Sequence, residues 1–101
     1  MKVKFEKGCK SFLKKHSHMQ KIAKKIATAI EKETNTGMTK VKLAIRNEVN
    51  GLPCYEFRLN LGKIGSVRIA FTVYNDLATI YFISTDLQKS TFTAEVQRIL
   101  A

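Results

Sequence analysis

Three charged residues, Glu56, Arg58 and Arg68, stand on the polar side of two neighbouring segments in which apolar and polar residues alternate. Successive side chains of a strand point to opposite faces of a sheet, so the alternation over 54–61 and 67–73 predicts two half-buried strands. The glycine-bounded stretch between them predicts a hairpin, and a one-residue slip would invert one strand. The register that keeps both apolar faces together therefore places Arg58 opposite Arg68 or one step diagonal to it.

A pair of arginines facing each other across two strands predicts an anionic ligand. Like charges directly opposite one another destabilise a sheet. Phosphate is the best geometric match, because the guanidinium fork donates two parallel hydrogen bonds to two phosphate oxygens. We therefore expect a phosphate-binding site on an open sheet surface, and we expect Arg68→Ala to leave the fold intact. Two separate surface arginines, each paired with an acidic neighbour, are the alternative.

Two further charged residues are candidates for the same site. Glu56 shares the polar face of Arg58 two positions away, so its carboxylate acts either as a general base or as an ion-pair partner. Lys89 lies in a polar loop, 84–90, that either overhangs the sheet or is simply solvated. The candidate catalytic residues are thus Arg68, Arg58, Lys89 and Glu56.

Other common chemistries lack their residues in this sequence. There is no glycine-rich phosphate loop, no Ser-His-Asp set and no acidic metal cluster. Cys9 and Cys54 have no CxxC partner and no nearby pair of histidines, so we expect two reduced, buried thiols. We therefore predict no cofactor and no metal site.

Positive charge is concentrated in the first half of the chain. The net charge is +10, and residues 1–50 hold 13 Lys and Arg against 4 acidic residues, whereas residues 51–101 hold 5 against 4. Clustered cations favour a polyanion partner, because binding releases the counterions of the phosphates. An acidic protein partner or a merely solvated lysine face would leave the same pattern. The candidate RNA-binding lysines are Lys21, Lys24, Lys25, Lys40 and Lys42.

The 101 residues predict a single α+β domain, 1–101, whose first half is mainly helical. Val3 and Phe5 share one face of a short N-terminal strand, and residues 9–16 follow helical spacing. Ser17 and Gln20 predict a capping box at the start of a longer helix. The expected apolar stripe of that helix is Met19, Ile22, Ala23, Ile26 and Ile30.

The period of the apolar residues then changes from 3.6 to 2. The alternating segments are 41–45, 54–61, 67–73 and 77–84, and the last is apolar on both faces, which predicts an interior strand. Phe92, Val96 and Ile99 predict a short terminal helix with Ser90 or Thr91 as its cap. We expect the order β-α-α-β-β-β-α, in which an N-terminal strand and a helical hairpin pack on an antiparallel sheet.

No apolar run approaches the length of a membrane span. Residues 1–5 also lack the apolar region that an export signal requires. We therefore expect a cytoplasmic protein with no membrane partner.

The second half of the chain resembles one known superfamily. In 50–59 a glycine-containing turn precedes a tyrosine and then alternating charged residues, and in 66–73 an arginine precedes an apolar run. Residues 77–84, with the polar loop and helix that follow, complete the same order. This succession resembles the RelE/ParE toxins of type II toxin–antitoxin systems, and it is most similar to the RelE-like branch.

The resemblance implies a toxin with an antitoxin partner, and it leaves the target open. RelE-like members are ribosome-dependent endoribonucleases (mRNA interferases) that cut messenger RNA and inhibit translation. ParE-like members act instead on DNA gyrase. The implied partners are thus a cognate antitoxin with the ribosome and mRNA, or with gyrase as the alternative target. An inactive member that binds RNA or its antitoxin is the third possibility.

Matched residue by residue, the resemblance covers part of the family's catalytic set. Arg68 matches the strand arginine that stabilises the scissile phosphate, and Arg58 matches a basic residue of the preceding strand. Glu56 departs from the pattern, because a second basic residue commonly stands there, and Lys89 roughly matches the basic residue of the last loop. The family's tyrosine near the final helix is absent, with Phe92, Thr93 and Ala94 in that region. We therefore expect a phosphate clamp with weak cleavage.

Overall fold

The computed structural model describes residues 1–100, which form an α+β domain with three α-helices and one five-stranded sheet. In chain order the elements are β1 (Lys2–Phe5), the 3-10 helix η1 (Lys7–Cys9), α1 (Lys10–Lys15), α2 (Met19–Asn35), β2 (Lys42–Leu43), β3 (Tyr55–Asn60), the 3-10 helix η2 (Gly62–Ile64), β4 (Ser66–Tyr74), β5 (Leu77–Ser84) and α3 (Lys89–Leu100). The expected α+β class is confirmed.

The sheet is mixed, with the strand order β1-β5-β4-β3-β2. The hairpins β3–β4 and β4–β5 are antiparallel, as expected, and β5 is an interior strand. Strand β1 pairs in parallel with β5, so the sheet is not antiparallel throughout. The expected order had three strands after the helical hairpin, whereas the structure has four, because Lys42 and Leu43 of the segment 41–45 pair with β3 as the short strand β2.

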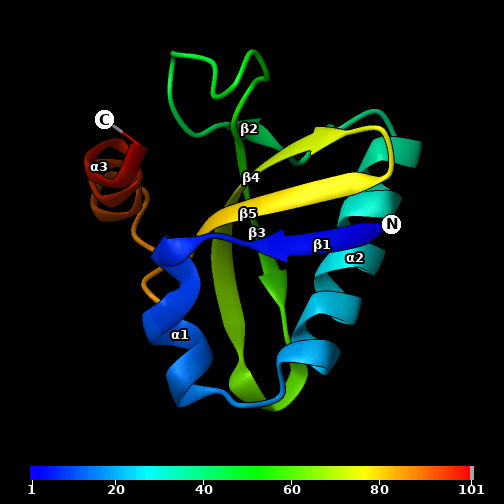
Figure 1. The fold of residues 1–101 in the computed structure, drawn as a ribbon, viewed down its shortest axis with the longest axis vertical. Helices are drawn as coiled ribbons and strands as arrows, with labels where there is room; N and C mark the ends of the chain where they lie inside the picture. Colours follow the sequence, from blue (N-terminus) through cyan, green and yellow to red (C-terminus); the bar gives the residue numbers. More distant parts are fainter. Residues whose placement is uncertain (101) are drawn as a thin grey trace.

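One face of the sheet is covered by α1 and α2, and Figure 1 shows α2 and α3 on opposite sides of it. The apolar residues of β4, such as Ile69 and Phe71, are fully buried there against Ile26 and Ile30 of α2. The apolar residues at alternate positions of β4 thus pack against the apolar stripe of α2 and form one apolar layer.

The apolar stripe of α2 differs from the expected one at its start. Met19 is 52% exposed, whereas Ile22, Ile26 and Ile30 are buried as expected. The helix begins at Met19 with His18 as its N-cap, and the cap side chain makes no hydrogen bond. The predicted capping box from Ser17 is therefore wrong, and Met19 lies in the first turn, beyond the part of the helix that the sheet covers.

The other face of the sheet carries a second, smaller core beneath α3. Phe92 and Val96 of α3 are buried against Ala70 of β4 and Tyr81 of β5. A β-bulge lies at Ala70/Phe71, where the pairing shifts so that Ala70 opposes Phe82 and Phe71 opposes Ile80. Tyr81 is the extra residue of this bulge, which places it in the core under α3.

Helix α3 begins earlier than predicted: a cap at Ser90 would make Thr91 the first helical residue, whereas the helix begins at Lys89. Ser90 and Thr91 therefore lie within the first turn. The carbonyl of Gln88 accepts the first helical hydrogen bond, from the amide of Phe92. Gln88 in turn is held by Asp86, whose side chain accepts from the Gln88 amide at 3.0 Å.

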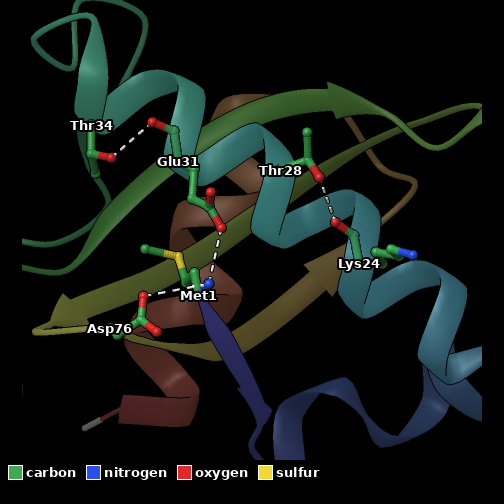
Figure 2. Close-up of polar contacts among 6 residues, drawn as sticks. All are labelled: Met1, Lys24, Thr28, Glu31, Thr34 and Asp76. Atoms are coloured by element: carbon green, nitrogen blue, oxygen red, sulfur yellow. Dashed lines mark hydrogen bonds and ion pairs between the residues drawn. The ribbon is translucent and has the colours of Figure 1, made fainter.

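The N-terminal amino group joins three elements that lie far apart in the sequence (Figure 2). It lies 3.0 Å from Glu31 of α2 and 3.4 Å from Asp76 of the β4–β5 turn. The hydrogen bond to Glu31 raises the pKa of this amino group above its ordinary value. None of the helices within residues 1–100 combines the length and apolar character that a bilayer crossing requires.

Candidate functional site

Three residues stand side by side across the three interior strands of the sheet, β3, β4 and β5, at the end of β5. Arg58 of β3 lies directly opposite Arg68 of β4, and Arg68 lies directly opposite Ser84 of β5. We call these three residues the arginine row. The predicted pairing of the two arginines is confirmed in its direct form: the alternation of β3 and β4 allowed the direct and the diagonal arrangement, and the structure adopts the direct one.

Arg68 is not on an open surface, contrary to the expectation from the sequence. Its side chain is only 18% exposed. One guanidinium nitrogen, Nη1, donates to Glu56 Oε1 at 3.2 Å, and the other, Nη2, donates to the carbonyl of Leu87 at 3.1 Å. The guanidinium carbon lies 6.0 Å from the centre of the Phe92 ring. The loop after β5 and helix α3 therefore fold over Arg68 and hold its planar group.

Glu56 is the most deeply buried charged side chain of this face, at 1% exposure. Its ion-pair partner is Arg68, although Arg58 is closer to it in the sequence. Of the two roles that the sequence allowed for Glu56, general base or ion-pair partner, the structure shows the ion pair. A general base must reach the proton that it removes, and this carboxylate is enclosed. Glu56 Oε2 and Arg68 Nε nevertheless lack a hydrogen-bond partner within residues 1–100. Such orphaned polar atoms are rare in native cores.

Arg58 is the accessible member of the arginine row. Its side chain is exposed, and no carboxylate within the described chain lies within ion-pair distance of it. Lys42 of β2 lies opposite Glu56 and is exposed as well, so it borders the same face. The accessible positive charges on this face thus surround the buried pair.

Lys89 begins α3 and is exposed. The contact of Leu87 with Arg68 brings the segment just before Lys89 to the arginine row. The loop 84–88 is itself ordered by a hydrogen bond from the Asp86 amide to the Ser84 hydroxyl at 3.0 Å. The loop therefore does overhang the sheet, which was one of the two alternatives from the sequence.

The five lysines that the sequence assigned to RNA do not form one surface. Lys21, Lys24 and Lys25 lie on α2, which covers the opposite face of the sheet from the arginine row. Lys42 lies at the edge of the face that carries the arginine row, and Lys40 lies in the turn that precedes β2. All five are exposed. The positive charge of the first half therefore spreads over two sides of the molecule.

Neither histidine lies on the face of the sheet that carries the arginine row. His16 packs on Phe12 with ring centres 4.5 Å apart, and His18 stands at the start of α2. Tyr81 is on the correct face, but it is 8% exposed within the core under α3. Nothing in the sequence alone predicted the position of Tyr81, because the bulge that turns it to this face has no local signature.

Both cysteines are buried free thiols, as predicted. Burial raises the pKa of the Cys9 thiol to about 12. Burial, with a smaller contribution from the charge of Glu56, raises the pKa of the Cys54 thiol to about 11. Neither thiol is therefore suited to act as a nucleophile. Within residues 1–100, no three His, Cys, Asp or Glu side chains gather in a group that could hold a metal ion.

The geometry of this face is suited to binding an anion more than to moving protons. An exposed arginine stands beside a second arginine whose orientation is fixed by Glu56, Leu87 and Phe92. Rigidly held cations stabilise negative charge that develops during a reaction. Comparison of the chain with protein-family models, with curated proteins and with solved structures finds no match.

Proposed function

We propose that this chain is the toxin of a type II toxin–antitoxin system and cleaves messenger RNA on the ribosome, as RelE-like toxins do. The observation that carries the proposal is the direct pairing of Arg58 with Arg68, which puts an accessible guanidinium beside an oriented one. The strongly basic first half supports a phosphate-rich target. A ribosomal target places the site of action in the cytoplasm, and the cognate antitoxin is the expected protein partner.

In this proposal the arginine row acts on the scissile phosphate. The ribose 2′-oxygen forms a bond to the adjacent phosphorus, and the bond from phosphorus to the 5′-oxygen breaks. The 2′-OH proton passes to solvent water and the departing 5′-oxygen takes a proton from water, so the products are a 2′,3′-cyclic phosphate and a 5′-hydroxyl. Arg58 neutralises the phosphorane that forms between these steps. Losing one such electrostatic contact typically lowers the rate by about 10²–10³.

The same geometry explains why cleavage by the isolated protein should be slow. The carboxylate that contacts the arginine row, Glu56, is 1% exposed and bonded to Arg68. Assistance by a general acid or base contributes about 10²–10⁴ in rate. The ribosome, which orients the messenger, would have to make up part of that difference.

The proposal is tested by induced expression with separate readouts of new protein and new DNA. We expect protein synthesis to stop first, and primer extension to show cuts within translated messages. Arg58→Gln should abolish the cuts, since it removes the accessible charge without touching the core. Arg46→Gln removes one exposed arginine outside the site and is the matched control. Unchanged cleavage by Arg58→Gln would remove the arginine row from the reaction.

A second candidate is a toxin without nuclease chemistry, acting on gyrase as ParE-like members do or binding RNA or antitoxin alone. It is favoured by the enclosure of the Arg68–Glu56 pair, in which both Nη atoms of Arg68 already have partners. In that case, DNA synthesis fails before translation, or growth stops without any new RNA ends. Either outcome would contradict the nuclease proposal.

A further inference from the structure

A second positively charged feature lies on the helical side of the molecule, away from the arginine row. Two adjoining hollows run along α2 from its start to Lys32, beside the segment that joins β3 to β4, and they share Lys21 and Lys25. We call them together the lysine groove. Its charged lining is Lys21, Lys24, Lys25, Lys32 and Lys63, and no acidic residue lines it. We propose that the lysine groove binds a single strand of nucleic acid.

The lysines of α2 form a continuous stripe. Lys21, Lys24, Lys25 and Lys32 stand at positions i, i+3, i+4 and i+11, which places them on one side of the helix. At the rise of an α-helix this stripe is about 16 Å long. Figure 2 shows Lys24 projecting from α2, with its carbonyl accepting a hydrogen bond from the Thr28 hydroxyl at 3.0 Å. A row of this length can contact several successive phosphates of one strand.

The stripe is not neutralised by the protein itself. Like charges three or four residues apart destabilise a helix. Within residues 1–100, none of the groove lysines lies within 4.0 Å of a carboxylate. The acidic residue of α2 closest in sequence to Lys21, Lys24 and Lys25 is Glu31. Its carboxylate is paired with the N-terminal amino group. The positive charge of the groove is therefore available to an anionic ligand.

The hollow nearest the start of α2 is shaped for a base as well as a phosphate. It has a volume of about 360 Å³ and an apolar floor of Ile22, Leu61 and Ile64. Lys25 is held at this floor by a 3.2 Å hydrogen bond from its Nζ to the Leu61 carbonyl. His18 and Lys63 stand at its rim. An unstacked base can lie on an apolar floor while the cations around it bind the flanking phosphates.

An acidic protein helix fits the groove less well. Such helices bind through apolar anchors spaced along one face, which need matching apolar ground on the receptor. The apolar floor of the groove is confined to the hollow nearest the start of α2, and no large apolar residue lines the hollow that continues along the helix to Lys32, so a helix laid along the groove would find apolar ground at one end alone. Phosphates require only the cations, because lysine binds phosphate as a point charge.

The test measures binding of a labelled 12-nucleotide single-stranded RNA to the purified full chain by fluorescence anisotropy. Lys21→Gln/Lys24→Gln/Lys25→Gln is compared with the control Lys7→Gln/Lys10→Gln/Lys14→Gln, which removes the same charge from exposed lysines outside the groove. Glutamine is a good helix former, so neither variant should lose helix content. We expect the groove variant to bind at least about tenfold more weakly than the control, with a salt slope reduced by about 2.

Three results would overturn the proposal. Equal losses in the two triple variants would mean that binding follows net charge alone. A loss confined to Arg58→Gln would place the strand on the arginine row. Unchanged RNA binding by the groove variant, with loss of binding to a poly-glutamate peptide, would assign the groove to an acidic protein. Binding needs no cleavage, so failure of the nuclease proposal would leave this result unaffected.

Discussion

Arg68 and Glu56 form an ion pair enclosed by α3 and the loop before it. Removing one partner of a buried pair leaves the other charge without compensation, which typically costs about 3–5 kcal/mol. Arg68→Ala should therefore lower the free energy of unfolding by this amount. Arg58→Ala, on the exposed side of the same row, should change it by less than about 0.5 kcal/mol. Urea unfolding measures both.

A double-mutant cycle separates the pair from the rest of the core. The variant Glu56→Leu/Arg68→Met replaces both charges by apolar groups, and we expect it to recover most of the stability that either single change loses. Additive losses would show that the two side chains act independently. The practical consequence is that loss of activity in Arg68→Ala needs a stability control, whereas Arg58→Gln reports on the site directly.

Ionisation of the buried Cys54 thiol should lower the free energy of unfolding at alkaline pH. Because burial raises the pKa of the Cys54 thiol to about 11, the folded chain holds this proton more tightly than the unfolded chain does. The stability from this effect is complete below about pH 8.5, the ordinary thiol pKa. It is lost as pH rises through the folded value of about 11. Cys54→Ala has no thiol to ionise, so its free energy of unfolding does not fall for this reason. The difference in free energy of unfolding between wild type and Cys54→Ala should therefore become smaller as pH rises.

Thermal melting at a series of pH values checks this expectation. Lysine and tyrosine titrations affect wild type and Cys54→Ala alike, so the difference between the two isolates the thiol. A gap that stays constant across the alkaline range would mean that the Cys54 thiol ionises as easily in the folded chain as in the unfolded one.

At the scale of elements, α2 contributes to the core through the middle of its stripe. Ile26 is fully buried and Met19 is 52% exposed, although both belong to the stripe that the sequence predicted. Ile26→Ala should cost about 2–5 kcal/mol, because it opens a cavity against β4. Met19→Ala should cost less than about 0.5 kcal/mol. Similar losses at the two positions, measured by denaturant unfolding, would contradict the observed start of the helix.

At the scale of the whole molecule, the two faces carry separate groups of cations. Arg58 and Lys42 lie on the α3 side of the sheet, and the lysine groove lies on the α2 side. A single extended strand would not readily engage both, whereas a large RNA that surrounds the protein can. This arrangement agrees with a ribosomal target for the proposed toxin.

Binding to ribosomes should therefore depend steeply on salt. Each neutralised phosphate contributes about −0.7 to −0.9 to the slope of log K against log salt. Co-sedimentation with ribosomes at rising salt measures this slope. Wild type should show a steeper slope than either Arg58→Gln or the groove triple variant. A flat response would indicate a protein partner or an apolar contact instead.

Much of the candidate site follows from local patterns in the sequence. Alternation over two strands and a short glycine-bounded turn place Arg58 opposite Arg68 or one step diagonal to it, and the structure shows the direct pairing. The helical period similarly predicts the burial of Ile22, Ile26 and Ile30. The α+β class, the interior position of β5 and the two buried thiols were predictable for the same reason, since each depends on short-range composition and spacing.

The tertiary structure alone decided how these elements cover one another. The enclosure of Arg68 depends on Leu87 and Phe92, which reach it only once α3 has folded back over the sheet. The parallel pairing of β1 with β5 joins segments more than 70 residues apart. The division of the lysines between two faces likewise depends on which side of the sheet α2 covers. A local period places a residue on a face of its own element, and only long-range packing determines what lies against that face.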